Sequence, residues 1–233
     1  VGGRGHHRVG GRGLVTLASP DGLDPAAPDA VMTAAPDSAD ALDALLARAQ
    51  AVALGPGLAI DPRAAAWIAA VLAAPVPAVL DAGALTALAG RPDALADAVG
   101  AVVITPHPGE AARLLSTTTA TIEADRPAAV RALAAATRAV VVLKGPRTLI
   151  CDGRHGADAI VINPTGGPAL ATAGSGDVLT GIIAALLAAG HPAAIAAALG
   201  AYLHGAAGDH LAATLGAGVI ASDLPDAVAR AAA

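Results

Sequence analysis

The chain has 233 residues, of which 55% are hydrophobic and only 1% aromatic, and its net charge is -5. That length suits one substantial domain or at most two small ones, and we predict a single domain over residues 1–233. Without Phe, the core must consist of closely packed Ala, Val, Leu and Ile. The chain has no basic stripe and few aromatic rings for stacking on bases, which argues against nucleic-acid binding.

The hydropathy pattern argues against a membrane protein. The longest apolar run, Val178–Gly190, is shorter than the roughly 20 residues that a spanning helix needs, and His191 and Pro192 interrupt it. We expect two buried helices there. Cys151 is alone, which excludes an internal disulfide and suits a reducing, cytoplasmic location. The first eight residues lack the apolar core of a signal peptide.

Short strand-like runs alternate with Ala-rich helical segments along much of the chain. The predicted strands are Leu14–Ala18, Ala51–Leu54, Pro77–Leu80, Ala101–Ile104 and Ala139–Leu143. The predicted helices are Asp40–Gln50, Arg63–Ala74, Gly109–Ser116 and Pro127–Thr137. Thr148–Cys151 and Ala157–Ile162 predict a hairpin, and the last third of the chain is mainly helical. This alternation is typical of βαβ units around a mostly parallel sheet.

Four of the predicted strands are followed by loops rich in Gly, Pro or polar residues. These loops are Gly55–Gly57, Asp81–Gly83, Thr105–Glu110 and Lys144–Thr148. In parallel sheets, ligands bind in the loops at the carboxyl ends of the strands. The sequence therefore predicts that the four loops form one cleft.

The most informative segment is the small-residue loop Asn163–Gly181, which leads into an apolar helix expected to begin at Asp177. A Gly-Ser-Gly turn before a helix points several backbone N–H groups at one place, which favours phosphate binding. A carboxylate at a phosphate site suggests that Asp177 acts as a base on a hydroxyl that meets the phosphate. The alternative is a favourable charge at the helix N-terminus, worth ~0.3–1 kcal/mol.

Other candidate residues each have a structural alternative. His107 lies between two prolines at a strand end and can bind a ligand, while Pro108 and Glu110 suit a helix start. Lys144 can hold a nucleotide phosphate or simply face water, as lysines mostly do. Arg147 is open to the same two readings. His204 is expected to be structural or solvent-facing, like His210.

Three motifs together resemble the ADP/ATP-dependent NAD(P)H-hydrate dehydratases, a group within the ribokinase-like superfamily. They are Thr105–Glu110, Lys144–Thr148 and Thr165–Gly181, and Gly13–Ala18 and Leu54–Leu58 are similar to that family as well. The likeness covers nearly the whole chain, and the third motif is the most specific. It implies a three-layer α/β/α fold with a mostly parallel sheet, whose first strand-helix unit is truncated here.

The resemblance also implies an activity. The substrate would be the S epimer of hydrated NAD(P)H (NADHX or NADPHX), which ADP or ATP phosphorylates at the 6-hydroxyl before elimination restores the dihydropyridine. The enzyme would be a metabolite-repair lyase that uses Mg²⁺. It would be a homo-oligomer, expected as a tetramer, with an NAD(P)H-hydrate epimerase as a functional partner.

The resemblance assigns roles to residues that match the family's motifs. Asp177 would be the catalytic base, and Gly57, His107 and Asp177 would contact the hydrated cofactor. The adenine nucleotide would be bound by Lys144, Gly145, Pro146, Arg147, Thr148 and Gly176. The amides of Ala173, Gly174 and Ser175 would form an anion hole for the phosphoryl group. No protein ligand of the metal is assigned.

The chain departs from the family pattern at several positions. Arg12 stands where a small residue is expected, Gly83 where the second aspartate of an Asp-Ala-Asp is usual, and Gly167 where asparagine is usual. Two other functions stay open: a small-molecule kinase of the same fold that acts on a thiazole or pyrimidine precursor, and a nucleotide-binding module without turnover. The choices between ADP and ATP, and between NADHX and NADPHX, also stay open.

Overall fold

The main sheet of the protein has six strands. The computed structural model describes residues 15–18, 32–34, 36 and 38–232. Within them the strand order is β3-β4-β5-β6-β7-β8. The strands are β3 (Val52–Leu54), β4 (Ala78–Leu80), β5 (Val102–Ile104), β6 (Val140–Leu143), β7 (Leu149–Asp152) and β8 (Ile160–Ile162). The first four are parallel, and β7 and β8 continue the sheet antiparallel, as the predicted hairpin requires.

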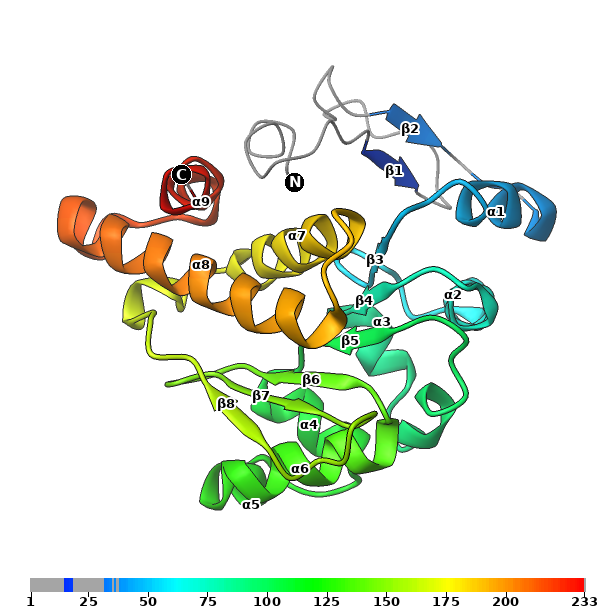
Figure 1. Cartoon of the computed structure of the whole chain (residues 1–233), viewed down its shortest axis with the longest axis horizontal. Coiled ribbons are helices and arrows are strands. Elements are labelled where there is room, and N and C mark those ends of the chain that lie inside the picture. The colour runs from blue at the N-terminus through cyan, green and yellow to red at the C-terminus, as the bar shows by residue number, and fades with distance from the viewer. Residues whose placement is uncertain (1–14, 19–31, 35, 37, 233) are drawn as a thin grey trace.

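Helices cover both faces of this sheet (Figure 1). One layer consists of α1 (Ala39–Leu46), α2 (Pro62–Ala73), α3 (Ala82–Ala87), α4 (Pro108–Leu114), α5 (Thr119–Ala124) and α6 (Arg126–Thr137). The other consists of α7 (Ser175–Ala188) and α8 (Ala193–Leu215), with α9 (Leu224–Ala231) packed on them. Short 3-10 turns are η1 (Pro92–Leu95), η2 (Pro168–Leu170), η3 (Gly216–Gly218) and η4 (Ala221–Asp223). In the described part of the chain, no helix is both long and apolar enough to cross a membrane.

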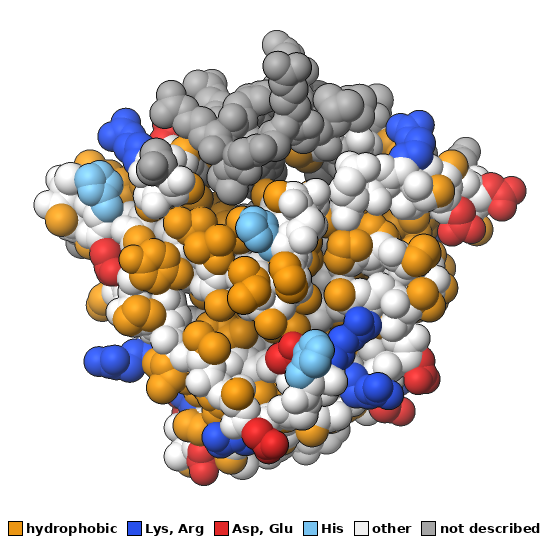
Figure 2. Space-filling view, viewed as in Figure 1, with side chains coloured by type: hydrophobic (Ala, Val, Ile, Leu, Met, Phe, Trp, Pro, Cys, Tyr) orange, Lys and Arg blue, Asp and Glu red, His pale blue; other side chains and the backbone are white. Residues whose placement is uncertain are grey.

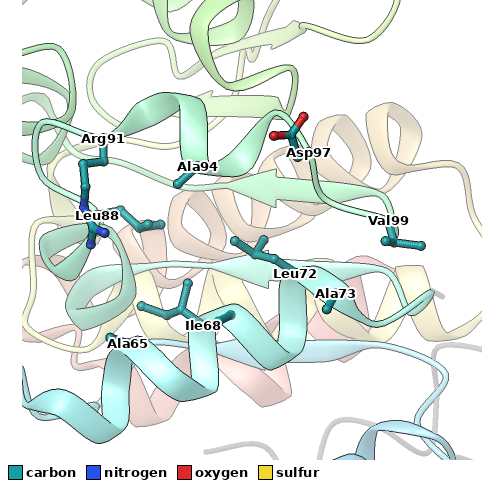
Figure 3. A pocket seen from close by; sticks show the side chains of 10 residues that line it. Ala65, Ile68, Leu72, Ala73, Leu88, Arg91, Ala94, Asp97 and Val99 are labelled. Atoms are coloured by element: carbon teal, nitrogen blue, oxygen red, sulfur yellow. The ribbon is translucent and has the colours of Figure 1, made fainter.

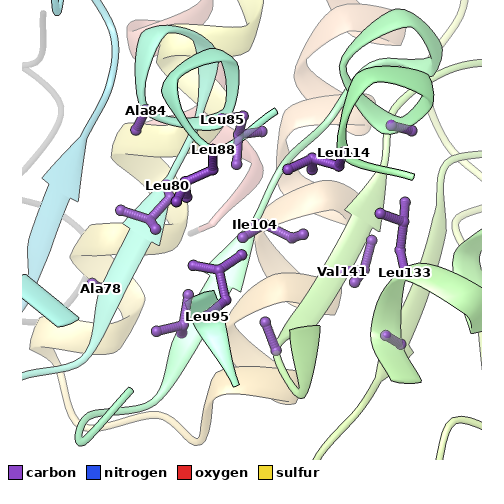
Figure 4. Packing of buried hydrophobic residues seen from close by; sticks show 14 of the residues in the cluster. Ala78, Leu80, Ala84, Leu85, Leu88, Leu95, Ile104, Leu114, Leu133 and Val141 are labelled. Atoms are coloured by element: carbon purple, nitrogen blue, oxygen red, sulfur yellow. The ribbon is translucent and has the colours of Figure 1, made fainter. Parts of the chain in front are cut away.

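Alternate strand residues build two separate cores. Leu80, Ile104 and Val141 pack against the α1–α6 layer, and Figure 4 shows them among leucines of that layer. Val79 and Val103 face the other way and pack against α7 and α8. Because both faces are buried, the strands read as continuous apolar runs in the sequence. The α/β class with a mostly parallel sheet and helices on both sides is thus confirmed.

The helix starts follow from local sequence. Asp61 caps α2 by accepting the N–H of Ala64 at 3.0 Å, and Asp125 caps α6 by accepting that of Ala128 at 2.9 Å. In each case proline sits in the first helical turn, where its missing N–H costs nothing. The predicted segments Arg63–Ala74 and Pro127–Thr137 therefore match the observed helices within one residue.

The first predicted strand does not belong to the main sheet. The segment predicted at Leu14–Ala18 contains β1 (Thr16–Ala18), but β1 pairs with β2 (Met32–Ala34) in a separate two-stranded parallel sheet. A short β-branched run indicates a strand without indicating its partner, and nothing in the sequence around Met32 predicted β2. The predicted truncation of the first strand-helix unit and Arg12 lie outside the described residues.

Candidate active site

The Gly-rich loop ends in an open helix N-terminus. Helix α7 begins at Ser175, two residues before the predicted start, because Gly174 adopts a left-handed conformation (φ +83°) that glycine tolerates. The Val178 N–H is the first to bond back to the capping residue, at 3.3 Å from the Gly174 oxygen. Within the described chain, no acceptor pairs with the N–H groups of Gly176 and Asp177. These two amides are therefore available to an anion at the positive end of the helix dipole.

Helix α8 holds the start of the Gly-rich loop by hydrogen bonds. The buried Asn163 amide donates to the Ala201 carbonyl at 3.0 Å, and the Thr165 hydroxyl lies 2.9 Å from the Tyr202 carbonyl oxygen. A Cβ on Gly205 would lie 2.2 Å from the Thr165 hydroxyl, so only glycine allows this approach. The loop is thus fixed in place before any ligand binds.

Gly167, where the family usually has asparagine, opens the short turn η2 on this loop. The neighbouring Gly166 N–H donates to the Asp209 carboxylate at 2.9 Å. A Cβ on Gly167 would approach that carboxylate only to 3.6 Å, an ordinary contact. The fold therefore has room for a side chain at this position.

A buried histidine ties α8 to the first turn of α7. His204 is 8% exposed, and its Nε2 lies 3.0 Å from the Oγ of Ser175. Burial lowers the pKa of His204 to about 4, a shift that the nearby Lys144 charge reinforces and the hydrogen bond to Ser175 opposes. The ring is therefore neutral near pH 7. Sequence reasoning left His204 as structural or solvent-facing, and the structure shows the buried, structural alternative.

Acid is expected to weaken the fold through His204. The unfolded chain takes up a proton near pH 6.5 but the folded chain only near 4, so stability is lost as pH falls between these values. The loss is on the order of 3 kcal/mol, since each pKa unit corresponds to about 1.4 kcal/mol. Urea unfolding of wild type and His204→Gln across this pH range measures it: the variant should lose much less stability in acid.

The matched control is His210→Gln, because His210 is exposed on the same helix. It should lose stability in acid as the wild type does. Equal acid sensitivity in His204→Gln and wild type would contradict the assignment.

Asp177 lies in the first turn of α7 and is partly buried. Burial raises its carboxyl pKa above the usual value, the nearby Asp81 charge raises it further, and Lys144 lowers it. A raised pKa makes the carboxylate a better proton acceptor, as a general base requires.

Beneath that turn lies a buried network centred on Asp81, the residue that follows β4. Asp81 is 1% exposed, and its Oδ1 is 2.8 Å from the Lys144 Nζ, which is 21% exposed. Its Oδ2 accepts the hydroxyl of Thr180 at 2.9 Å, and its Oδ1 also accepts the Ala82 N–H at 2.9 Å. One carboxylate therefore joins the end of β6, the start of α3 and the middle of α7.

The same network brings Lys144 to Gly176. A Cβ built on Gly176 would lie 3.3 Å from the Lys144 Nζ and 3.6 Å from the Asp81 Oδ2. The ammonium thus lies beside Gly176 in the first turn of α7. Two residues predicted from separate motifs to hold the nucleotide are neighbours in the structure.

His107 and Glu110 form the start of α4. His107 Nδ1 accepts the Gly109 N–H at 3.0 Å, and Glu110 accepts the His107 N–H at 2.8 Å, a capping box. The helix start that Pro108 and Glu110 predicted is therefore confirmed, and one ring nitrogen of His107 is already used. The ring is still half exposed, with Nε2 3.5 Å from the carboxylate, and Glu110 lies 3.8 Å from the Lys144 Nζ. This loop therefore meets the Lys144 loop.

Gly57, which is predicted to contact the substrate, and Gly83 differ in how much room they have. Gly57 has φ +72° and nothing within 4 Å of an added Cβ, so it is open to solvent. A Cβ on Gly83 would lie 2.4 Å from the Leu58 oxygen and 3.0 Å from the Gly55 oxygen. The backbone here leaves no space for the aspartate that the family usually has at Gly83.

The loop Lys144–Thr148, which is predicted to hold the nucleotide, follows the end of β6. Gly145, Pro146 and Arg147 are exposed, and the Thr148 hydroxyl donates to the Gly145 oxygen at 3.2 Å. Arg126 of α6 donates to carbonyls of this loop from behind.

A separate hollow of about 440 Å³ lies between α2 and η1 (Figure 3). Its lining is Ala65, Ile68, Ala69, Leu72, Ala73, Leu88, Arg91, Ala94, Asp97 and Val99. None of these residues is among the predicted site residues. Arg91 and Asp97 are its only charged lining residues and the rest are apolar, and the hollow lies apart from the Gly-rich loop, so we do not assign the chemistry to it.

The side chains of the site fit Mg²⁺ only if the ion binds together with the nucleotide phosphates. In the described ranges, no group of three or more His, Cys, Asp or Glu is placed to hold a metal ion. The oxygens of Asp81 are already bonded to Lys144 and Thr180. Mg²⁺ usually keeps several waters and takes one or two carboxylates plus phosphate oxygens. A bound ion would therefore be held mainly by the nucleotide phosphates, and Glu110, whose Oε2 already accepts the His107 N–H, would offer its Oε1.

Comparison with known proteins decides the family. The family model described as NAD(P)H-hydrate dehydratase matches residues 10–230. The chain belongs to this family. It is 47% identical over 233 residues to the bifunctional NAD(P)H-hydrate repair enzyme Nnr of Moorella thermoacetica, covering 93% of this chain and 43% of the relative. It is 44% identical over 196 residues to the ADP-dependent (S)-NAD(P)H-hydrate dehydratase of Neisseria meningitidis, covering 81% and 65%.

A solved structure agrees with this assignment. The ADP/ATP-dependent NAD(P)H-hydrate dehydratase of Bacillus subtilis, co-crystallised with ATP/Mg²⁺ and soaked with CoA, superposes with a TM-score of 0.71 at 34% identity, covering 86% of this chain and 72% of that one. The predicted ribokinase-like fold is confirmed. The chain spans less than half the length of the Moorella relative and about two-thirds of the Neisseria one.

Sequence reasoning missed several residues that this NAD(P)H-hydrate dehydratase fold brings to the site. Asp81 was noted only as part of a cleft loop, Thr180 only as part of a motif, and Arg126 was not singled out. The one available signal for Asp81 was a carboxylate placed directly after a buried strand, where parallel sheets bind ligands.

Proposed function

We propose that this chain is a nucleotide-dependent (S)-NAD(P)H-hydrate dehydratase that converts NADHX or NADPHX back to NAD(P)H. The observation that carries the proposal is the arrangement around α7. The free amides of Gly176 and Asp177, the ammonium of Lys144 and the Asp177 carboxylate all meet at one helix start. The names of the Neisseria and Bacillus relatives support the same substrate and donor.

In the proposed reaction, Asp177 takes the proton of the substrate's 6-hydroxyl while that oxygen attacks the terminal phosphorus of ADP or ATP. The Lys144 ammonium and the free amides of Gly176 and Asp177, with those of Ala173 and Gly174, stabilise the charge of the phosphoryl group. The N–H of Ser175, the third predicted anion-hole residue, donates instead to the Thr172 oxygen at 3.2 Å. The transfer leaves AMP or ADP from the donor. The C6–O bond of the phosphate ester then breaks, phosphate leaves with the bonding electrons, and loss of the proton from C5 forms the C5–C6 double bond that restores the dihydropyridine. A bound Mg²⁺ would neutralise phosphate charge, with Glu110 as its protein ligand.

The two ligands lie on different sides of Asp177 in this proposal. Lys144, Gly145, Pro146, Arg147 and Thr148, with Gly176, hold the adenine nucleotide. Gly57 and His107 contact the hydrated cofactor, with the exposed Nε2 side of the imidazole as the polar contact. The support is that Gly57 and His107 follow strands β3 and β5, which lie on either side of β4 in the sheet.

The proposal includes the setting of the enzyme. We infer that residues 1–233 act as one domain, in the cytoplasm, on substrate that an NAD(P)H-hydrate epimerase equilibrates, since the Moorella relative is named a bifunctional repair enzyme. We also infer a homo-oligomer. Apolar side chains gather on the face where α8 crosses the view (Figure 2), and Val161, Ile162, Ile195 and Tyr202 are exposed on β8 and α8. Sedimentation of wild type and Tyr202→Glu tests it: a monomeric wild type would rule it out.

The activity is tested with purified protein, NADHX and ADP or ATP. Recovery of the reduced nicotinamide absorbance supports repair. Phosphate transfer to a thiazole or pyrimidine alcohol without that recovery would identify a kinase instead. Nucleotide binding without either reaction would identify a binding module.

A further inference from the structure

Arg126 reaches the nucleotide loop from another element. It is the first residue of α6, directly after the capping Asp125, so its position is fixed by the helix start. Its Nη2 donates to the carbonyls of Leu143 at 3.3 Å and Lys144 at 3.4 Å, and its Nη1 donates to that of Pro146. One guanidinium therefore holds three carbonyl groups of the segment that begins the loop.

These bonds determine where the loop amides point. In a trans peptide the C=O and the following N–H point in opposite directions, and the described residues contain no cis peptide. The first peptide shows this directly, because the Leu143 carbonyl faces Arg126 while the Lys144 N–H donates to the Pro106 oxygen at 2.9 Å. By the same geometry, the N–H groups of Gly145 and Arg147 point away from Arg126. In the part of the chain that the structure describes, neither amide has an acceptor.

The loop depends on the guanidinium for its shape. Gly145 has φ +137°, and a Cβ there would lie 2.9 Å from the Arg126 Nη2, so the glycine backbone rests on the guanidinium. Arg147 has φ +51°, a left-handed conformation that a non-glycine residue adopts at a cost. Without Arg126, the three carbonyl groups would lose their hydrogen-bond donor. The left-handed conformation of Arg147 would then lose the contacts that support it.

The charge of Arg126 is not neutralised by a partner. Across the described residues, no carboxylate forms an ion pair with it, and its Nε is buried without a hydrogen-bond partner. An arginine stays charged at any physiological pH. A full positive charge therefore lies behind the exposed amides of the loop, which favours an anionic ligand on their outer side.

We propose that Arg126 is a positioning residue for the nucleotide: it holds the Lys144–Thr148 loop so that the amides of Gly145 and Arg147 face the phosphates of ADP or ATP. This inference rests on the proposed function, which places the nucleotide at this loop. Arg126 itself does not touch the ligand. It acts through the backbone, so it affects nucleotide affinity more than the chemical step.

The test compares Arg126→Gln, Arg126→Lys and the control Arg131→Gln, since Arg131 is exposed on the same helix. Calorimetry gives the Kd for ADP, and kinetics with NADHX give kcat at saturating ADP. Arg126→Gln should weaken ADP binding about tenfold or more, because hydrogen bonds from a charged donor are lost, and change kcat less than about threefold. Arg126→Lys keeps the charge but not the planar set of N–H donors, so its Kd for ADP should lie between those of the wild type and Arg126→Gln. Arg131→Gln should match the wild type.

Amide hydrogen exchange without ligand gives a readout that does not need the proposed function. The Lys144 N–H, which donates to the Pro106 oxygen at 2.9 Å, should exchange faster in Arg126→Gln than in wild type or Arg131→Gln. Unchanged exchange, or an unchanged Kd for ADP in a folded Arg126→Gln, would overturn the positioning role. A wild type that binds neither ADP nor ATP would overturn the proposed function, and the exchange result would then decide whether Arg126 orders the loop. Arg126→Lys serves for the comparison if Arg126→Gln fails to fold.

Discussion

Replacing Asp177 with Asn should lower kcat by roughly 10²–10⁴-fold, the usual contribution of a general base, while ADP still binds. Asn keeps the size of the side chain and cannot accept the hydroxyl proton. In the wild type, activity should fall as acid protonates Asp177, and burial together with the Asp81 charge places this fall above the ordinary carboxyl pKa. Initial rates of NADH recovery across pH, with calorimetric ADP binding, measure both effects.

Asp226→Asn is the matched control, because Asp226 is an exposed carboxylate in the first turn of another helix, α9. It should keep wild-type rates. A folded Asp177→Asn variant that retains wild-type kcat would rule out Asp177 as the base.

Removing the carboxylate of Asp81 should have the second large effect, on stability. Asp81→Ala leaves the Lys144 ammonium without its 2.8 Å partner and removes the acceptor of Thr180. Breaking a buried ion pair costs about 3 kcal/mol, at the lower end of the usual range because Lys144 is 21% exposed. Urea unfolding near pH 7 measures the loss.

The same variant should shift the acid limb of activity to lower pH, because Asp81 raises the pKa of Asp177 through its charge. The control Asp43→Ala removes an exposed carboxylate on α1 and should leave stability and the pH profile unchanged. A stable Asp81→Ala variant with an unshifted profile would show that the network does not support the site.

The predictable parts of the fold were those that local sequence controls. Ala139–Leu143 is continuously apolar because β6 is covered on both faces, and Asp125 with Pro127 marks the start of α6. The separate pairing of β1 with β2 and the short helix α3 were not predicted. Both depend on contacts between segments whose own sequences carry no strong pattern.

The site was predictable where one motif carried the chemistry, as with Asp177 and the glycine turn. Contacts between residues of different motifs could not be predicted from the sequence. Asp81 meets Lys144 across 63 residues and Thr180 across 99. Arg126 lies at an ordinary helix start, and only the fold shows that its guanidinium reaches the Lys144–Thr148 loop.

In the proposed reaction, the phosphoryl group passes to the substrate's hydroxyl before that oxygen leaves carbon. NADHX carrying ¹⁸O at the 6-hydroxyl tests this directly in a single turnover with ADP or ATP. We expect the label in the released phosphate. The hydroxyl oxygen joins C6 to phosphorus in the phosphate ester, and it leaves with the phosphate when the C6–O bond breaks. Label found in water, with NADH formed, would contradict it.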